Sequence, residues 1–494
     1  MKHNVITHAL PLVALVGLAG AVEFEKIELP ATQGSKYTTV TIGPDGLLYA
    51  TTLEGEIRRW ALEPDGTTGE AEVITSLQDA HGGDRLLIGL AFDPAAEPDE
   101  LVAWVSHATY GFDGMDDWGG TITRLSGPGL ETVEDYVINL PRSCRNHVTN
   151  GVAFGPDGAL YFVQGSNSAM GEPDSDWCDR PERLLNAAVL RLDPSLIETP
   201  PLDAQTNDGG TYDPYGPSAP LTLYATGVRN AYDLVWHGNG NLYVPVNGSG
   251  SGGSTPAGTT GAACGDGSTY EGPDVPGLDG VGTQADYLFR VAPGDYNGHP
   301  NPARCEFVMN GGNPTAGTDP AQVSEYPVGT DPDVNYHGFA FDFGDHKSPN
   351  GIIEYQSCSG DGALHGKLVV VRYGQPDDII VLTPGGAEQD IVDSETGSGG
   401  LTGFSNPLDL VEDPSRGFLY ISEYGASKIT LLRPLDPPAD CPADLDCSGA
   451  VDISDFLTLL GRWGQTGVRG DLDGGGVGIT DLLTLLGLWG ACTG

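Results

Sequence analysis

The stretch GVAFGPDGALYFVQGS, residues 151–166, joins two apolar runs through a short Pro-Asp-Gly turn. Proline presets φ, and Asp and Gly tolerate the backbone angles of tight hairpins, so the stretch predicts a β-hairpin. Similar stretches are TIGPDGLLYATT at 41–52, WHGNGNLYVPVNG at 236–248 and EDPSRGFLYISEYG at 412–425. The same hairpin therefore recurs along the chain.

Two looser copies are AFDPAAEPDELVAWVSH at 91–107 and DGALHGKLVVVRYG at 361–374. Repeated hairpins without alternating helices favour an all-β fold, a six-bladed β-propeller with one hairpin for each blade. A β-sandwich is the alternative. Long insertions fall in the loops, where a rigid propeller carries its function. The apolar strands that we expect lie at 47–51, 101–105, 160–163, 242–246, 368–372 and 419–422.

Composition and charge limit the function classes. The 494 residues include 73 Gly and 37 Pro, which suits many short strands joined by turns. The formal charge of −45 repels nucleic acid and anionic lipid, so we expect neither as a partner. An acidic surface of this kind is compatible with a saline habitat or with bound divalent cations.

The N-terminal residues 1–21, MKHNVITHALPLVALVGLAGA, resemble a secretory signal, with Lys2, an apolar run and small residues before the cleavage point. A buried N-terminal helix is the alternative. No later stretch is apolar for long enough to span a bilayer. We therefore expect a secreted bacterial protein, located outside the cell, on its surface or in the periplasm.

Export gives meaning to the even number of cysteines, which is eight. We expect disulfides between Cys144 and Cys178 and between Cys264 and Cys305, with a third bond closing the C-terminal region. That third bond would join Cys441 to Cys492. The sequence does not fix the connectivity.

A Pro-rich linker at 435–443 separates the propeller, at 22–434, from a small C-terminal domain at 444–494. The segments 452–464 and 478–490 each predict a short amphipathic helix, and the two helices can bury their apolar stripes against each other. The stripes consist of Phe456, Leu459, Leu460 and Trp463 in the first helix and Leu482, Leu485, Leu486 and Trp489 in the second.

The stretch DLDCSGAVDISD at 444–455 has the spacing of an EF-hand calcium loop, with oxygen donors at alternate positions and Gly449 at the sharp turn. A second copy at 471–481 is one residue short, and Gly475 stands where an acidic ligand is expected, so we expect a weaker site or none. The alternative is an acidic segment without metal. The first set of ligands is Asp444, Asp446, Ser448, the carbonyl of Ala450, Asp452 and Asp455, and the second is Asp471, Asp473 and Asp481.

A calcium loop followed by a helix, repeated without a leading helix, resembles the dockerin family. This resemblance implies a cohesin-like or cell-surface protein partner for the C-terminal domain.

The run HVTNGVAFGPDGALYFVQG, which begins at His147, resembles the glucose/sorbosone dehydrogenase family of soluble quinoprotein sugar dehydrogenases. DRLLIGLAFDP at 84–94 and LYATGVRNAYDLVW at 223–236 resemble two further family segments. The resemblance covers about 35–434. Its remaining segments are GDYNGHPNPARCEFV at 294–308, SPNGIIEY at 348–355, GKLVVVRY at 366–373 and NPLDLVEDPSRGFLYISEYG at 406–425.

The resemblance implies a six-bladed propeller that oxidises a small sugar or alcohol. His147 would take the hydroxyl proton, a role that suits imidazole near neutral pH. Pyrroloquinoline quinone (PQQ), held by cations and calcium, would take the hydride. The residues expected around the cofactor are Asp84, Asn146, Arg229, Asn230 and Arg372.

Three departures from the family pattern keep other functions open. Asn146 stands where a close branch has an acid, residues 406–409 read Asn-Pro-Leu-Asp in place of Arg-x-Arg-Asp, and NGSGSGGSTP at 247–256 replaces the calcium-ligating stretch. A non-catalytic propeller that binds carbohydrate or protein is therefore the main alternative. A calcium-dependent lactonase is a third, and it requires an acid cluster at the centre of the propeller.

Overall fold

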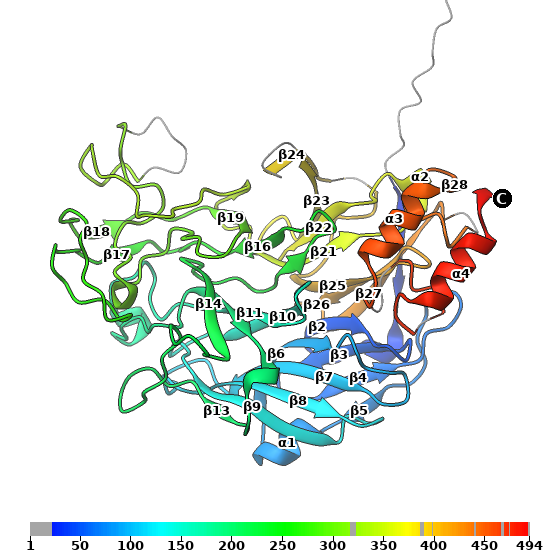
Figure 1. Ribbon diagram of the computed structural model, residues 1–494, viewed down its shortest axis with the longest axis horizontal. Helices are drawn as coiled ribbons and strands as arrows, with labels where there is room; N and C mark the ends of the chain where they lie inside the picture. The colour runs from blue at the N-terminus through cyan, green and yellow to red at the C-terminus, as the bar shows by residue number, and fades with distance from the viewer. Residues whose placement is uncertain are drawn as a thin grey trace, which may run out of the picture.

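The computed structural model describes residues 22–316, 323–385, 390–397, 399–438, 441–465, 469–473 and 475–492. The expected signal at 1–21 lies outside these residues. Six four-stranded antiparallel blades surround a central axis, and the second blade gains a fifth strand (Figure 1). The six-bladed propeller is therefore confirmed, and the sandwich alternative is wrong.

The blades follow one another along the chain. The first contains β2 (Tyr37–Ile42), β3 (Leu48–Thr52), β4 (Ile57–Trp60) and β5 (Glu72–Ile74); the second β6 (Arg85–Phe92), β7 (Val102–Thr109), β8 (Gly120–Ser126), β9 (Thr132–Leu140) and the added β13 (Leu202–Asp203); and the third β10 (Thr149–Phe154), β11 (Leu160–Gln164), β12 (Ala188–Leu192) and β14 (Leu221–Thr226). The fourth contains β15 (Val235–Trp236), β16 (Leu242–Val246), β19 (Asp286–Val291) and β20 (Phe341–Gly344); the fifth β21 (Pro349–Tyr355), β22 (Lys367–Arg372), β23 (Asp378–Gly385) and β24 (Asp390–Glu395); and the sixth β25 (Pro407–Asp413), β26 (Phe418–Glu423), β27 (Lys428–Pro434) and β1 (Phe24–Glu28).

The ring is closed by the N-terminal strand. β1 pairs with β27 in the last blade, in a register that sets Phe24 opposite Pro434. Because the two ends of the propeller share one sheet, the closure protects the strand edges that an open arrangement would expose.

Every strand expected from the repeated hairpin is the second strand of a blade, namely β3, β7, β11, β16, β22 and β26. In the hairpin of the third blade, the amide of Gly155 donates to the carbonyl of Ala159 at 2.8 Å. The amide of Ala159 donates in turn to the Asp157 carboxylate at 3.2 Å. The Pro-Asp-Gly turn therefore has the chemistry that the sequence indicates.

The core lies between the blades. On β11, Leu160 and Phe162 pack towards the second blade, whereas Tyr161 and Val163 pack towards the fourth. This alternation follows from the two-residue period of a strand. Each blade is therefore buried on both faces.

The first strand of every blade lines the axis: β10, β6, β2, β25, β21 and β15 contact one another in that succession. In an antiparallel blade, the start of the first strand and the end of the second lie at the same end of the sheet. We call this side of the ring the entry face and the opposite side the exit face.

The remaining elements are peripheral. They are α1 (Ser76–His81), the kinked α2 (Ser359–Gly362), the pair β17 (Gly253–Thr255) and β18 (Leu278–Val281), and four 3-10 turns at Pro30–Thr32, Ser175–Trp177, Pro194–Leu196 and Pro302–Arg304. No helix among the described residues is long and apolar enough to cross a membrane.

The C-terminal domain contains α3 (Ile453–Gly461), α4 (Ile479–Gly487) and a short pairing of β28 (Ala450–Val451) with β29 (Gly490–Ala491). Both expected helices are present, side by side at the edge of the propeller (Figure 1). The expected burial of both stripes is wrong in part. Leu459 and Leu485 are buried, but Trp463 and Trp489 are 48% and 49% exposed.

Leu459 and Leu485 lie in a small core with Leu445, Val451 and Val477, and Phe456 and Leu482 pack half-buried against it. This core is too small to cover the rest of each stripe. Cys441 and Ala443, which we assigned to the linker, also pack in this core. The core of the C-terminal domain therefore includes residues from both sides of the expected boundary at 443/444.

All three expected disulfides are present, at Cys144–Cys178, Cys264–Cys305 and Cys441–Cys492. A fourth, Cys358–Cys447, was not predicted, and it joins the propeller to the C-terminal domain.

Candidate active site

All six propeller residues singled out from the sequence lie on the entry face. Asp84 precedes β6, Asn146 and His147 precede β10, and Arg229 and Asn230 precede β15. Arg372 is the last residue of β22, a second strand, and therefore ends on the same face. The topology thus brings residues from four blades to one side of the ring.

His147 is held by its own loop and by the strand beside it. Its backbone amide donates to Ser143 Oγ at 3.0 Å, and the Cys144–Cys178 disulfide anchors the loop. Gly165 is required here, because a Cβ at this position would lie 2.7 Å from the Cβ of His147. The imidazole is therefore placed by covalent and packing constraints.

The hydrogen bonds of His147 define its tautomer. Nδ1 lies 3.1 Å from both the carbonyl oxygen and the Oγ of Ser166. A carbonyl can only accept, so Nδ1 carries the proton and Nε2 keeps its lone pair. No described residue hydrogen-bonds Nε2. Nε2 is also not among the fully buried polar atoms that lack a partner, so it is not sealed inside the protein. Nε2 is therefore available to a ligand.

Burial, with Arg229 acting in the same direction, lowers the pKa of His147 well below its usual value. The ring is consequently neutral across the physiological pH range. A neutral imidazole with an anchored Nδ1 and an unengaged Nε2 has the properties of a general base.

The indole of Trp177 covers this imidazole. The ring centroids lie 4.2 Å apart with an interplanar angle of 41°, and His147 is only 4% exposed. The guanidinium groups of Arg229 and Arg145 lie 5.9 and 5.8 Å from the Trp177 ring. Approach to His147 therefore requires passage beside Trp177 or its displacement.

Arg229 is held by backbone carbonyls through Nε and Nη1, and no described residue accepts from its Nη2. Nε donates to Ala169 O at 2.8 Å, and Nη1 donates to Asn247 O at 3.2 Å and Gly248 O at 3.0 Å. Burial lowers its pKa to about 10. Asn247 and Gly248 open the stretch that replaces the calcium-ligating segment of the resembled family, and the guanidinium donates to both of their carbonyls.

Of the other predicted residues, three have hydrogen-bond or ion-pair partners within the protein and the fourth is exposed to solvent. Arg372 forms a two-point ion pair with Asp378, at 2.7 Å from Nε and 2.6 Å from Nη2. Asn230 Oδ1 accepts from Asn150 at 3.2 Å, and Asp84 Oδ1 accepts from Gln78 at 3.1 Å. Asn146 is exposed.

Of the two arginines expected to offer cations to PQQ, Arg372 is already paired with Asp378, whereas Arg229 forms no ion pair with a described residue. The segment 406–408 adds no cation. These residues therefore offer a tricarboxylate fewer cations than the sequence leads us to expect. The cavity beside Arg229, lined by Gln284, Asn297 and His299 among others, is about 20 Å³. That space suits a water molecule, and His147 does not line it.

Sequence reasoning missed the residues that support His147. Glu182 is buried and accepts from the amides of Asn167 and Ser168, each at 2.9 Å, and His299 Nε2 lies 3.2 Å from it. It thereby holds the loop whose Ser166 orients the imidazole. The sequence could have placed Trp177 near His147. Trp177 adjoins Cys178, whose expected partner, Cys144, lies three residues before His147.

Groups of three or more potential metal ligands occur at four places among the described residues, and none includes Asp233 or Asp409 at the propeller axis. Within these residues, the lactonase alternative therefore lacks the acid cluster that it requires.

Two of these groups are the expected calcium loops. The carboxylates of Asp444, Asp446 and Asp455 lie within 4.8 Å of one another, as do those of Asp471, Asp473 and Asp481. Asp452 caps α3, and Asp455 closes the capping box, so the first loop leads directly into its helix. The Ala450 carbonyl accepts from Ser448 Oγ at 3.1 Å. Hard oxygen donors in this arrangement suit calcium.

No known protein family profile matches the chain. No curated protein matches it either.

Solved structures share its fold at low identity. A Thermus thermophilus oxidoreductase of the glucose dehydrogenase type is 18% identical over 83% of this chain and 100% of its own, with a TM-score of 0.51. The PQQ domain of a Coprinopsis cinerea pyranose dehydrogenase, in its holo form, is 12% identical over 83% and 97%, with a TM-score of 0.50. A Trichoderma reesei carbohydrate-active enzyme of family AA12 is 14% identical over 84% and 96%, with a TM-score of 0.51. The chain therefore has the propeller fold of solved sugar dehydrogenases.

Proposed function

We propose that the propeller oxidises a hydroxyl group of a small sugar or alcohol, with His147 as the proton acceptor. The observation that carries the proposal is the neutral imidazole on the entry face, whose Nδ1 is bonded to Ser166 and whose Nε2 is unengaged. The fold, shared with solved sugar dehydrogenases, supports the same reaction class.

In this reaction the hydroxyl proton passes to Nε2 of His147, the carbon gives up a hydride, and a carbonyl forms. Ser166 holds the ring in the required tautomer throughout. The hydride needs an acceptor, and the resemblance implies PQQ, whose bound form would supply an electrophilic quinone. Because Arg372 is paired with Asp378 and the segment 406–408 adds no cation, we assign no residue of this chain to that cofactor.

A dye-linked assay of the purified full-length protein tests the proposal. Aldoses and simple alcohols are supplied with a redox dye, with and without PQQ and calcium. We expect substrate-dependent dye reduction that His147→Gln abolishes while leaving the unfolding midpoint nearly unchanged. An absence of turnover with every acceptor, including PQQ, would refute it.

A second candidate function is a non-catalytic propeller that binds carbohydrate or protein. The pairing of Arg372 with Asp378 and the lack of a cation at 406–408 favour it, because a binding site needs no cofactor cations. Affinity electrophoresis in polysaccharide gels distinguishes the two candidates. The binding function would be supported if polysaccharide retards the His147→Gln variant as much as the wild type and the wild type oxidises no substrate.

We also propose that the protein is secreted and that its C-terminal domain binds calcium and a cohesin-like or cell-surface partner. Four disulfides support export. The converging carboxylates support calcium binding. Binding of a partner is supported by four exposed apolar side chains of the two helices, Leu460, Trp463, Leu486 and Trp489. Calcium titration calorimetry of the full chain tests the metal, and the Asp446→Asn/Asp473→Asn variant is its control.

A further inference from the structure

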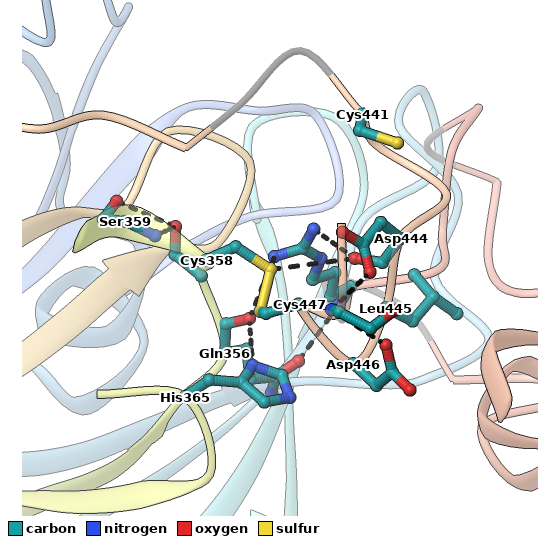
Figure 2. Close-up of a disulfide and its surroundings, with 12 residues drawn as sticks. Gln356, Cys358, Ser359, His365, Cys441, Asp444, Leu445, Asp446 and Cys447 are labelled. Carbon is teal, nitrogen blue, oxygen red and sulfur yellow. Dashed lines mark hydrogen bonds between the residues drawn. A yellow bond between two sulfur atoms is a disulfide. The ribbon is translucent and has the colours of Figure 1, made fainter. Parts of the chain in front are cut away.

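The C-terminal domain is covalently joined to the propeller at a site distant from the linker in sequence. Cys358 lies in the loop that follows β21, and Cys447 is the fourth residue of the first calcium loop (Figure 2). The bond spans a sequence separation of 89 residues. It restrains the calcium loop directly, in addition to the chain connection at 435–440.

Arg469 bridges the same two parts of the protein. Its backbone amide donates to Gln356 Oε1 at 3.1 Å, and Nη1 lies 2.6 Å from Cys358 Sγ. Nη2 donates to the carbonyl oxygen of Asp444. One partly buried guanidinium therefore contacts the propeller loop, the disulfide and the first residue of the calcium loop.

The propeller side of this contact is rigid. Glu412, a buried residue of β25, accepts from the amides of Gln356 and Ser357 at 2.7 and 2.8 Å. Gly362 has a φ of 73°, and a Cβ there would lie 2.8 Å from the Cβ of Cys447. The close approach of the two chains thus depends on a position that favours glycine.

The contact lies on the exit face. Gln356 and Cys358 follow the end of β21, and Glu412 lies near the end of β25, both of them first strands. His147 precedes the start of β10, also a first strand. The candidate active site and the C-terminal domain are therefore at opposite ends of the blades.

We propose that the C-terminal domain is a fixed base on the exit face, held by Cys358–Cys447 and Arg469, and not a flexible tether. A partner that binds the exposed side of α3 and α4 then holds the propeller with its entry face directed away from that partner. The fixed contact between the two domains does not depend on the proposed function. Only the importance of directing the entry face away from the partner rests on that function.

Small-angle X-ray scattering of the full-length protein tests the fixed arrangement. We expect the wild-type profile to fit a single arrangement and the Cys358→Ser/Cys447→Ser variant to show a larger maximum dimension and radius of gyration. A wild-type profile that fits only with the domain detached overturns the proposal. Failure of the dye assay would leave this scattering result unchanged, so the two failures are distinguishable.

A second measurement keeps the disulfide intact and tests Arg469. Because Nη1 lies over Cys358 Sγ, Arg469→Ala should make the Cys358–Cys447 bond several-fold faster to reduce by dithiothreitol, as read by mass spectrometry of alkylated peptides. The Cys264–Cys305 bond serves as the internal reference, and Arg469→Lys as the variant that keeps the charge. Equal reduction rates in wild type and Arg469→Ala would show that Arg469 does not hold the interface.

Discussion

Trp177 lies over His147 with ring centroids 4.2 Å apart, and the disulfide at the next residue, Cys178, returns to the loop of the same histidine. The imidazole and the indole that covers it are thus parts of one cross-linked loop pair. Access to the imidazole is therefore controlled by Trp177, whereas burial and Arg229 keep its pKa low and Ser166 fixes its tautomer.

Replacing Trp177 tests this control. Trp177→Ala should expose Nε2 and raise the rate at which diethylpyrocarbonate modifies His147 several-fold, as measured by peptide mass spectrometry. The loss of a half-buried aromatic contact should lower the free energy of unfolding by about 2 kcal/mol. Trp177→Phe keeps a ring and should behave nearly as wild type. An unchanged modification rate in Trp177→Ala would show that the indole does not limit access.

The Cys144–Cys178 bond should contribute to stability through loop closure. It spans 34 residues, and closing such a loop restricts the unfolded chain by about 4 kcal/mol. We expect Cys144→Ala/Cys178→Ala to lower the free energy of unfolding by about that amount in guanidinium titrations. The variant should also lose dye-linked activity, because Trp177 and His147 lose their anchor. Full activity in the variant would contradict this coupling.

The hairpins and the face on which the site lies could be predicted from the sequence, because both depend on local patterns. A turn such as Gly155–Gly158 fixes a hairpin, and a residue such as His147 just before a first strand must lie on the entry face. The partners of Arg229 and Arg372 could not be predicted. They depend on backbone carbonyls of a long insertion and on Asp378, which a family motif does not describe.

The same limit applies to the C-terminal domain. The spacing of apolar residues predicts helices correctly, but it does not say that the first two residues of each stripe pack in or against the core while the tryptophans stay exposed. Nor does it pair Cys358 with Cys447, since that bond depends on how two domains meet.

Calcium should stabilise the C-terminal domain selectively. With the carboxylates of each loop within 4.8 Å of one another, removal of the ion leaves like charges in close contact. We expect a chelator to lower the melting temperature of this domain by several degrees and to increase amide exchange in α3 and α4. Asp455→Asn should reproduce the effect without chelator. Unchanged exchange in both helices after chelation would contradict a structural role for calcium.

Two acidic residues at the propeller axis should give the stability a defined pH dependence. Asp409 Oδ2 accepts from the amide of Val40 at 2.8 Å, and Asp233 Oδ2 accepts from that of Ile352 at 3.1 Å. Burial raises the pKa of Asp233 to about 6, and burial together with the Asp233 charge raises that of Asp409 well above its usual value.

The folded protein therefore retains protons that the unfolded chain releases above about pH 4, so stability should fall as pH rises from 4 through 6. We expect Asp233 alone to account for a loss of about 2 kcal/mol over this interval and Asp409 to add to it, measured by urea titrations at successive pH values. Asp409→Asn removes a buried charge while keeping an acceptor for Val40, so it should flatten the profile and raise stability at pH 8. Asp99→Asn, at an exposed position, is the matched control. A profile in Asp409→Asn as steep as that of wild type would mean that the axial carboxylates do not set the pH dependence.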